Sequence, residues 1–398
     1  MSSSSSDRPG LKPETALVRV GREKSITGPF VNPPVIHAST VLYNNVDDMV
    51  HHRQRYVYGR RGTPTIDALS SAISELEGAA GTVLCPSGLS AVTTALLSCL
   101  ASGDHLLMID CAYAPARNFA KTILKRYGIE TTFFDPHIGA DIGSLFNERT
   151  RAVYLEAPGS QTFEMPDVPA IASVAKAHGV ATIFDNTWAT PLYFKPLAAG
   201  VDVTLIAATK YVGGHSDIML GTVSANDDYW PKLKDTHGTL GLCVGPDDIY
   251  LGLRGLRTMA VRLEKQMQSG LVVAKWLEAR PEVAHVLHPA LESNPGYALW
   301  KRDMTGASGL FGVLFKDFTA TDAASFIDGL DLFGIGASWG GFESLAILSN
   351  PVPNRDATKW SEDGALIRIH IGLEDTGDLI ADLEASFVQV AAAKSAGG

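Results

Sequence analysis

Apolar residues gather in short runs between about residue 80 and residue 225, and segments with helical spacing separate these runs. Several runs are apolar without alternation, which is typical of strands covered on both faces of a sheet. Short apolar strands that alternate with helices predict a βαβ succession and a mostly parallel sheet. The predicted strands are residues 82–85, 105–109, 131–134, 151–155, 180–184, 203–206 and 219–224.

Helices are predicted over residues 90–101, 115–127 and 168–178. In residues 246–278, Leu253, Leu256, Met259 and Leu263 recur at helical spacing, which predicts one long connecting helix. Later strands and helices mix, which predicts a smaller α+β domain. Its predicted strands are residues 284–287, 310–315 and 366–371, and its predicted helices are residues 320–329 and 376–391.

A chain of 398 residues is long enough for a large domain and a smaller one. We expect an N-terminal tail and subunit-contact segment (1–57), a large cofactor-binding α/β domain (58–245), a connecting helix (246–280) and a C-terminal α+β domain (281–398). The first segment has too little regular structure for a core of its own. Its serine-rich first ten residues lack an apolar stretch and are predicted to be a disordered tail.

Composition narrows the class of protein. With 33 basic and 43 acidic residues, the formal charge of −10 opposes binding to nucleic acid. The apolar stretches are too short for a membrane span. The acidic charge makes a small molecule the expected partner, and the lack of an apolar core in the first ten residues makes the cytoplasm the expected location. The four cysteines lack the spacing of a zinc site or a disulfide framework. His215 and Asp217 lack a third ligand, so no metal site is predicted.

Two polar residues end predicted strands of the large sheet. Asp185 follows the strand at 180–184, and Lys210 comes shortly after the strand at 203–206. In an open parallel sheet, ligands bind beyond the carboxyl ends of the strands, so these two side chains can converge on one ligand. A lysine for a Schiff base and an acid beside a ring nitrogen are what pyridoxal phosphate requires. The pair therefore suggests that cofactor.

Two other segments could hold its phosphate. Ser87, Gly88 and Leu89 join a strand to a helix, whose N-terminal N–H groups suit an anion, although a simple helix cap would have the same sequence. Arg60 lies in the glycine-rich turn 58–63 and could pair with a phosphate, or it could be a solvated charge.

Two further residues are candidates for contacts with the ring and the substrate. Tyr113 follows another strand and could stack on a cofactor ring, although ordinary packing is as compatible with its position. Arg368 alternates with isoleucines in residues 366–371 and could bind a carboxylate, or it could lie on the exposed face of an edge strand.

Together these segments resemble the Cys/Met-metabolism family of pyridoxal-phosphate enzymes, from about residue 58 to residue 384. The most specific element is the run Ala-Thr-Lys-Tyr-x-x-Gly-His-Ser-Asp at residues 208–217. The run Ser338-Trp339-Gly340-Gly341 and residues 366–375 are most similar to the bacterial cystathionine β-lyase branch. The γ-synthase and γ-lyase branches usually carry a leucine in place of Trp339.

The resemblance implies an aspartate-aminotransferase-like fold (fold type I), usually assembled as a homotetramer with active sites shared across a dimer interface. It implies β-elimination from L-cystathionine to homocysteine, pyruvate and ammonia, in methionine biosynthesis. Lys210 would form the Schiff base and act in catalysis with Tyr113, which stacks on the ring, while Asp185 pairs with the ring nitrogen. The other implied contacts are Gly88, Leu89 and Thr209 to the phosphate, Tyr58 and Arg60 from the neighbouring subunit, and Arg368, Ser338, Trp339 and Ser160 to the substrate.

Two departures from the family pattern concern individual contacts. Ala208 stands where many relatives have a serine, and residues 156–161 replace the Glu-Ser-Pro-x-Asn-Pro run of the γ branches, which leaves the role of Ser160 open. The alternatives are a γ-lyase or γ-synthase, a cysteine desulfhydrase or S-alkyl-cysteine lyase, and an aldolase that uses Lys210 without a cofactor. A non-catalytic regulatory relative would be expected to have lost the lysine or the aspartate.

Overall fold

The computed structural model describes residues 11–397, so the predicted disordered tail at residues 1–10 lies outside the described residues. Its main element is a seven-stranded sheet in the order β1-β7-β6-β5-β4-β2-β3, whose strands β2 to β6 are parallel, with β7 antiparallel to both of its neighbours. The prediction of a mostly parallel sheet is confirmed. The strands are β1 Gly81–Cys85, β2 His105–Ile109, β3 Glu130–Phe134, β4 Thr150–Glu156, β5 Ala181–Asp185, β6 Val203–Ile206 and β7 Gly221–Ala225.

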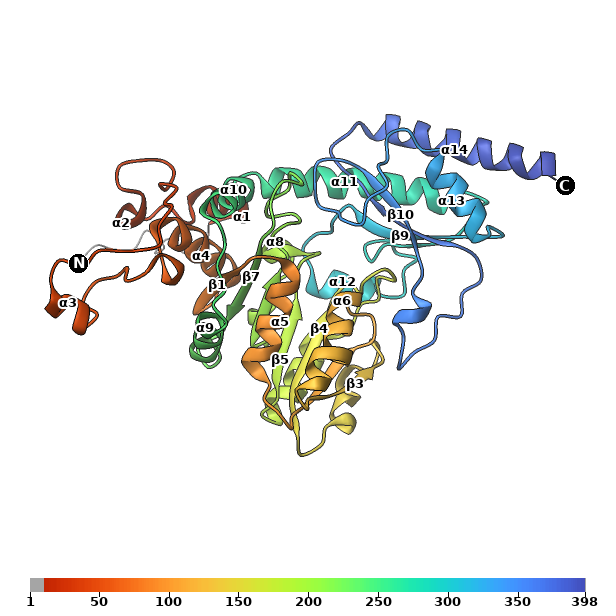
Figure 1. Ribbon diagram of the computed structural model, residues 1–398. Helices are drawn as coiled ribbons and strands as arrows, with labels where there is room; N and C mark the ends of the chain where they lie inside the picture. Colours follow the sequence, from red (N-terminus) through yellow and green to blue (C-terminus); the bar gives the residue numbers. More distant parts are fainter. Residues whose placement is uncertain (1–10, 398) are drawn as a thin grey trace.

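Helices cover this sheet (Figure 1). All residues of β1, β2, β5, β6 and β7 are buried, as their continuous apolar sequences predict. Helix α5 packs across β6 and β7, and α4 packs against β1. The helices of this part are α4 Pro64–Glu77, α5 Gly88–Cys99, α6 Ala114–Phe119, α7 Val168–Ala177, α8 Thr190–Tyr193 and α9 Trp230–Thr239; a π-helical segment, Ala120–Leu124, continues α6, and short 3₁₀ helices occur at Gly59–Arg61, Gly139–Leu145 and Leu197–Ala199.

The prediction of one long connecting helix is wrong in one respect. The segment forms two helices, α10 (Pro246–Leu256) and α11 (Met259–Glu278). At the break, the N–H groups of Arg257 and Thr258 bond to carbonyls three residues back, which tightens the last turn of α10. A Cβ at Gly255 would lie 2.2 Å from the carbonyl oxygen of Gly213. The chain therefore turns where α10 touches the segment that follows Lys210.

The second domain is a four-stranded antiparallel sheet in the order β10-β11-β9-β8. Figure 1 shows α11 running from the N-terminal side of the molecule to this sheet. Arg368 lies on β11, between β10 and β9, so the interpretation of an edge strand is wrong. The elements are β8 Val283–Leu287, β9 Leu310–Phe315, β10 Leu345–Ser349, β11 Leu366–His370, α12 Tyr297–Asp303, α13 Ala320–Asp328, α14 Thr376–Gly397 and a 3₁₀ helix at Val352–Asn354; β10 was not predicted.

The N-terminal segment contains three short helices, α1 (Pro13–Arg19), α2 (Lys24–Thr27) and α3 (Val46–Val50). Leu17, Val20 and Ile26 are buried in a cluster that includes residues of α4. This segment therefore adds to the core of its own chain, and its contact with another subunit stays a prediction. The boundaries at residues 57, 245 and 280 also stay a prediction. Within residues 11–397, no helix is long and apolar enough to cross a membrane.

Candidate active site

Lys210 lies at the junction of the two domains. Its Nζ donates a hydrogen bond of 2.6 Å to Ser338 Oγ, and it lies 5.5 Å from the centre of the Trp339 ring. In the described part of the chain, no carboxylate forms an ion pair with this amine. Burial, followed by the positive charge of Arg368, lowers the pKa of Lys210 to about 8. A lysine that loses its proton so near neutrality is suited to act as a nucleophile and a base.

A glycine loop holds Ser338 and Trp339 against this lysine. Gly340 has φ +83°, and a Cβ there would lie 3.0 Å from Lys210 Cα. The Gly340 N–H donates to Nε2 of His370 at 3.1 Å, and burial lowers the pKa of that histidine to about 3, so its ring is neutral. His370 was not predicted as part of the site. Its place two residues after Arg368, on the same face of the strand, was the available signal.

Arg368 lies beside the same loop. Its Nη2 donates to the Ser338 carbonyl oxygen at 3.1 Å. Burial lowers the pKa of Arg368 to about 10, so it remains a cation at neutral pH. No ion pair joins it to a carboxylate among residues 11–397, which leaves its other N–H groups for an anionic ligand. A guanidinium in this state suits the planar carboxylate of an amino acid.

Asp185 is the last residue of β5 and is tied to the strand that leads to Lys210. Its Oδ1 accepts hydrogen bonds from the N–H and the hydroxyl of Thr187, and the Ala207 N–H donates to that hydroxyl at 2.9 Å. Burial raises the pKa of Asp185, while the hydrogen bonds from Thr187 oppose the shift and stabilise the carboxylate. Thr187 was missed by sequence reasoning, although it is two residues from Asp185.

A second buried acid, Glu156, stands next to Asp185 in the register of β4 and β5. Its Oε2 accepts a hydrogen bond of 2.7 Å from the Tyr113 N–H. Burial and then the charge of Asp185 raise the pKa of Glu156 well above its usual value. Burial thus disfavours the charged form of Glu156, and its hydrogen bond fixes the backbone of Tyr113. The Tyr113 side chain is half-exposed, as a residue that faces a ligand would be.

The predicted phosphate segment lies next to the strand end before Lys210. Helix α5 begins at Gly88, and Ser87 caps it by accepting from the Ser90 N–H at 3.0 Å. A Cβ at Gly88 would lie 2.5 Å from Ala207 Cβ, so only glycine fits there. The first N–H groups of a helix have no partner within it, so those of Gly88 and Leu89 suit a phosphate. The hydroxyl of Thr209 donates to the Leu220 carbonyl and would have to change partner to reach a phosphate.

Three of the predicted site residues lie apart from the residues around Lys210. Arg60 donates to the Gly238 carbonyl oxygen at 2.8 Å, beside α9, and Tyr58 forms an isolated bridge with Thr40. Within this chain they therefore belong to the N-terminal side, and their reach into a neighbouring subunit stays a prediction. The Ser160 N–H donates to the Cys111 carbonyl oxygen at 2.8 Å, two residues before Tyr113, so Ser160 lies at the border of the site.

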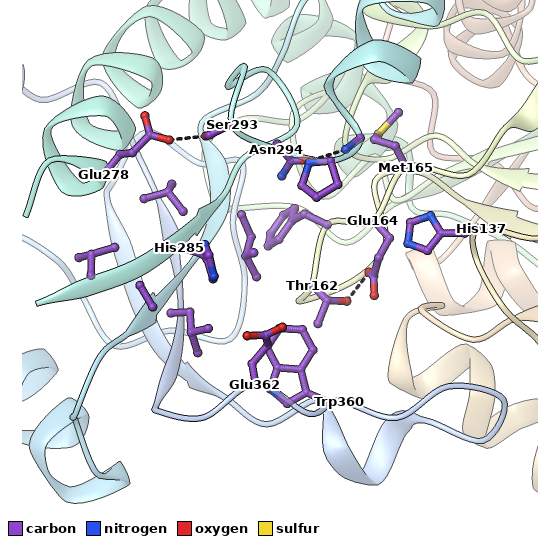
Figure 2. Close-up of a pocket in the computed structure, with 18 residues that line it drawn as sticks. His137, Thr162, Glu164, Met165, Glu278, His285, Ser293, Asn294, Trp360 and Glu362 are labelled. Atoms are coloured by element: carbon purple, nitrogen blue, oxygen red, sulfur yellow. Dashed lines mark hydrogen bonds between the residues drawn. The ribbon is translucent and has the colours of Figure 1, made fainter.

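A separate cavity of about 380 Å³ lies between β8 and the segment 162–165 (Figure 2). Thr162 and Glu164 from the large domain and Trp360 and Glu362 from the small domain line it, but none of the predicted site residues does. Figure 2 shows Trp360 on the same side of this cavity as Thr162. This cavity is therefore separate from the predicted site around Lys210.

The fold and the lysine–aspartate pair define a pyridoxal-phosphate enzyme of fold type I, as predicted. The chain belongs to the family described as Cys/Met metabolism PLP-dependent enzymes, whose profile matches residues 14–388. A Corynebacterium glutamicum metB structure, 30% identical, superposes with a TM-score of 0.89 over 96% of this chain and 98% of that chain. The cystathionine γ-synthase structure of Xanthomonas oryzae pv. oryzae, 29% identical, gives a TM-score of 0.88 over 96% and 99%.

Similar proteins of known sequence indicate which branch of the family this chain resembles. Cystathionine β-lyase MetC of Escherichia coli is 43% identical over 95% of this chain and 99% of its own length. A Rhizobium johnstonii protein provisionally named a cystathionine β-lyase is 52% identical over 95% and 96%. An L-alanine/L-glutamate racemase of Wolbachia pipientis is 38% identical over 96% and 98%. The family therefore includes relatives with more than one reaction.

The described residues fit pyridoxal phosphate, the cofactor of this family. Lys210 would hold its aldehyde carbon, and Asp185 would hold its ring nitrogen. The space that a Cβ at Gly88 would fill, next to unpaired helix N–H groups, suits its phosphate. Gly88, Asp185 and Lys210 all lie at or beyond the carboxyl ends of strands of one sheet, where such a cofactor would bind.

Proposed function

We propose that this protein is a carbon–sulfur lyase that catalyses β-elimination from L-cystathionine, giving homocysteine, pyruvate and ammonia. The observation that carries the proposal is the contact of Lys210 with Ser338, in the Ser338-Trp339 run of the β-lyase branch. The similarity to cystathionine β-lyases along nearly the whole chain supports the same reaction.

The substrate is bound by residues from both domains. Arg368 pairs with its α-carboxylate, because the guanidinium is charged and has no carboxylate of its own in the described chain. Ser338 and Trp339 lie against Lys210 and would contact the substrate there, and Ser160 would reach it from the Tyr113 side. Tyr113 covers the cofactor ring from its position above Glu156. These contacts orient the Cα–H bond towards Lys210.

Lys210 moves the protons. With a pKa of about 8 before the cofactor binds, its amine can accept the α-proton at neutral pH and then donate it to the departing sulfur. The cofactor, when bound, accepts the electron pair left at Cα. Asp185 keeps the proton on the ring nitrogen, because Thr187 stabilises its negative charge. Ser338 Oγ holds the amine of Lys210 in line for both transfers.

The racemase among the relatives supports a second candidate reaction, since removal and return of the α-proton by one lysine also interconverts amino-acid enantiomers. The γ-lyase and γ-synthase branches and the desulfhydrase or S-alkyl-cysteine lyase activities remain alternatives for the same site. All of them depend on Lys210 and Asp185, so the products must distinguish them.

The products from L-cystathionine test the proposal directly. Pyruvate and homocysteine in equal amounts are expected from the purified yellow protein. If 2-oxobutyrate and cysteine form instead, the enzyme is a γ-lyase. If L-alanine is racemised while cystathionine is left intact, the proposal is wrong.

We also propose that the enzyme serves methionine biosynthesis in the cytoplasm as a homotetramer with shared active sites. The free cysteines Cys85, Cys99, Cys111 and Cys243 suit a reducing compartment. The position of Tyr58 and Arg60 on the N-terminal side is compatible with contacts to a neighbouring subunit. Light scattering measures the number of subunits in the assembly. If Arg60 binds the cofactor phosphate in a neighbouring subunit, Arg60→Ala should weaken retention of the cofactor.

A further inference from the structure

The loop between β10 and β11, residues 350–364, is bonded to the large domain. Asp110, which follows β2 and is fully buried, accepts hydrogen bonds from the N–H groups of Asp356, Ala357 and Thr358 at 2.9, 3.1 and 2.8 Å, and from the Thr358 hydroxyl at 2.8 Å. Burial alone would raise the pKa of Asp110, but these hydrogen bonds outweigh burial and lower it. One carboxylate thus collects four donors from the other domain.

A buried arginine reinforces this contact. Arg117 is 2% exposed and lies between the carboxylates of Asp110, at 3.0 Å, and Asp356. Its guanidinium also donates to the Asp110 carbonyl oxygen at 2.7 Å and lies 4.0 Å from the centre of the Phe133 ring. We call Asp110, Arg117, Asp356 and Thr358 the interdomain latch.

A second ion pair joins the same loop to another part of the large domain. Arg355 donates to Glu164 at 2.5 Å and to the Thr162 hydroxyl. The Thr162 N–H in turn bonds to the Ser160 carbonyl oxygen at 2.9 Å. Farther along the loop, Trp360 lines the same cavity as Thr162 and Glu164 (Figure 2). The loop therefore lies against both segments that border the candidate active site.

The latch lies between Tyr113, which is proposed to cover the cofactor ring, and the strand that carries Arg368. The Arg117 N–H donates to the Tyr113 carbonyl oxygen at 3.1 Å, so the latch and Tyr113 share the start of α6. The loop leads into β11, which carries Arg368. A small hollow is lined by Ala114 and Ser160 on one side and by Asn354 of the loop on the other. The loop thus lies between the Tyr113 side of the site and the strand that carries Arg368.

We infer that Asp110 and Arg117 are positioning residues for substrate binding, which hold loop 350–364 against the Tyr113 side of the site. The identity of the substrate rests on the proposed function, whereas the attachment of the loop does not. The proposed cofactor contacts come from the large domain, whereas Arg368, which is proposed to bind the substrate carboxylate, comes from the small one. Release of the loop therefore weakens substrate binding and leaves the proton transfers by Lys210 largely unchanged.

Steady-state kinetics of the holoenzyme test the positioning role. For Arg117→Gln, KM for cystathionine is expected to rise ~10-fold or more, the scale for losing a hydrogen bond to a charged group, while kcat stays within ~3-fold. Arg117→Lys keeps the positive charge, so its KM should lie between that of the parent and that of Arg117→Gln. An unchanged KM, or a fall in kcat alone, overturns the inference.

A stability-matched control separates positioning from general weakening. Ser386→Ala removes a buried hydroxyl that donates to the Phe326 carbonyl oxygen within the small domain, away from the latch. Its KM is expected to match the parent even where its loss of stability equals that of Arg117→Gln. An equal rise in KM would mean that the latch is only structural.

Limited trypsin digestion tests the loop without any substrate. Lys359 is exposed on loop 350–364, and cleavage after it should be faster in Arg117→Gln and in Asp110→Asn than in the parent or in Ser386→Ala. Unchanged cleavage at Lys359 overturns the inference. If the parent does not cleave cystathionine, the proposed function fails while this digestion result still decides whether the latch holds the loop.

Discussion

Lys210, which is partly buried, and Arg117, which is fully buried, are two cations in opposite circumstances. The amine of Lys210 has a hydroxyl, Ser338, as its hydrogen-bond partner and a second cation, Arg368, nearby. The guanidinium of Arg117 lies between two carboxylates, Asp110 and Asp356. Burial without a counter-charge favours release of the proton and prepares a reactive amine. Burial with counter-charges keeps the cation charged and fixes the groups around it.

Removing each cation should therefore affect a different property. Lys210→Ala is expected to reduce cystathionine cleavage at least ~100-fold, the lower range for loss of a general acid–base group, and to abolish the visible absorbance of lysine-bound cofactor. Lys176→Ala on the exposed face of α7 is the matched control and should retain both. Turnover at the parent rate in Lys210→Ala would refute the central assignment.

The paired cation is tested through its partner. Asp110→Ala leaves Arg117 and three backbone N–H groups short of an acceptor, so the free energy of unfolding should fall by about 3–5 kcal/mol. Urea titration measures this loss. Glu130→Ala, which breaks an exposed pair with Arg149, should cost under ~1 kcal/mol. If Asp110→Ala also lost less than ~1 kcal/mol of unfolding free energy, the paired cation Arg117 would not stabilise the fold, and its contrast with Lys210 would disappear.

The loop that holds Ser338 on Lys210 is tested with a pair of glycines. Gly340 and Gly241 both have positive φ, and alanine at either position should cost about 1–2 kcal/mol in unfolding free energy. A Cβ at Gly340 would press on Lys210, whereas one at Gly241 would meet nothing within 4 Å. Gly340→Ala alone should therefore lose activity. Equal activity in both variants would show that the loop does not position the lysine.

The shifted pKa of Lys210 also predicts a pH dependence for the stability of the cofactor-free protein. The pKa of Lys210 falls from its usual 10.5 to about 8 on folding, so the folded chain releases this proton first as the pH rises. Lys210→Met should therefore be more stable than the parent below about pH 8, and this advantage should shrink between about pH 8 and pH 10.5. Denaturant unfolding at several pH values measures the difference, and a constant advantage would contradict the shift.

Sequence reasoning succeeded where local pattern determines structure. Short apolar runs separated by helical segments predicted the seven strands, and the structure confirms that Asp185 ends β5 and that Lys210 follows β6, as the strand-end argument requires. The break between α10 and α11 was missed because helical spacing continues from Leu256 to Met259 across it. The interdomain latch was missed because its partners, Asp110 and Thr358, are 248 residues apart, and a carboxylate after a strand has no distinctive sequence signal.

The antiparallel strand β7 has a consequence for how the chain folds as it is made. β1 lies at the edge of the large sheet and pairs with β7, through a ladder that joins Gly81 to Ala225. During synthesis, β1 therefore has no native partner until about 140 further residues have emerged, and such non-local pairing is slow. Because β1 leads into Gly88 and β6 precedes Lys210, the segment proposed to bind the phosphate and the lysine become neighbours in the sheet only when β7 pairs with both strands.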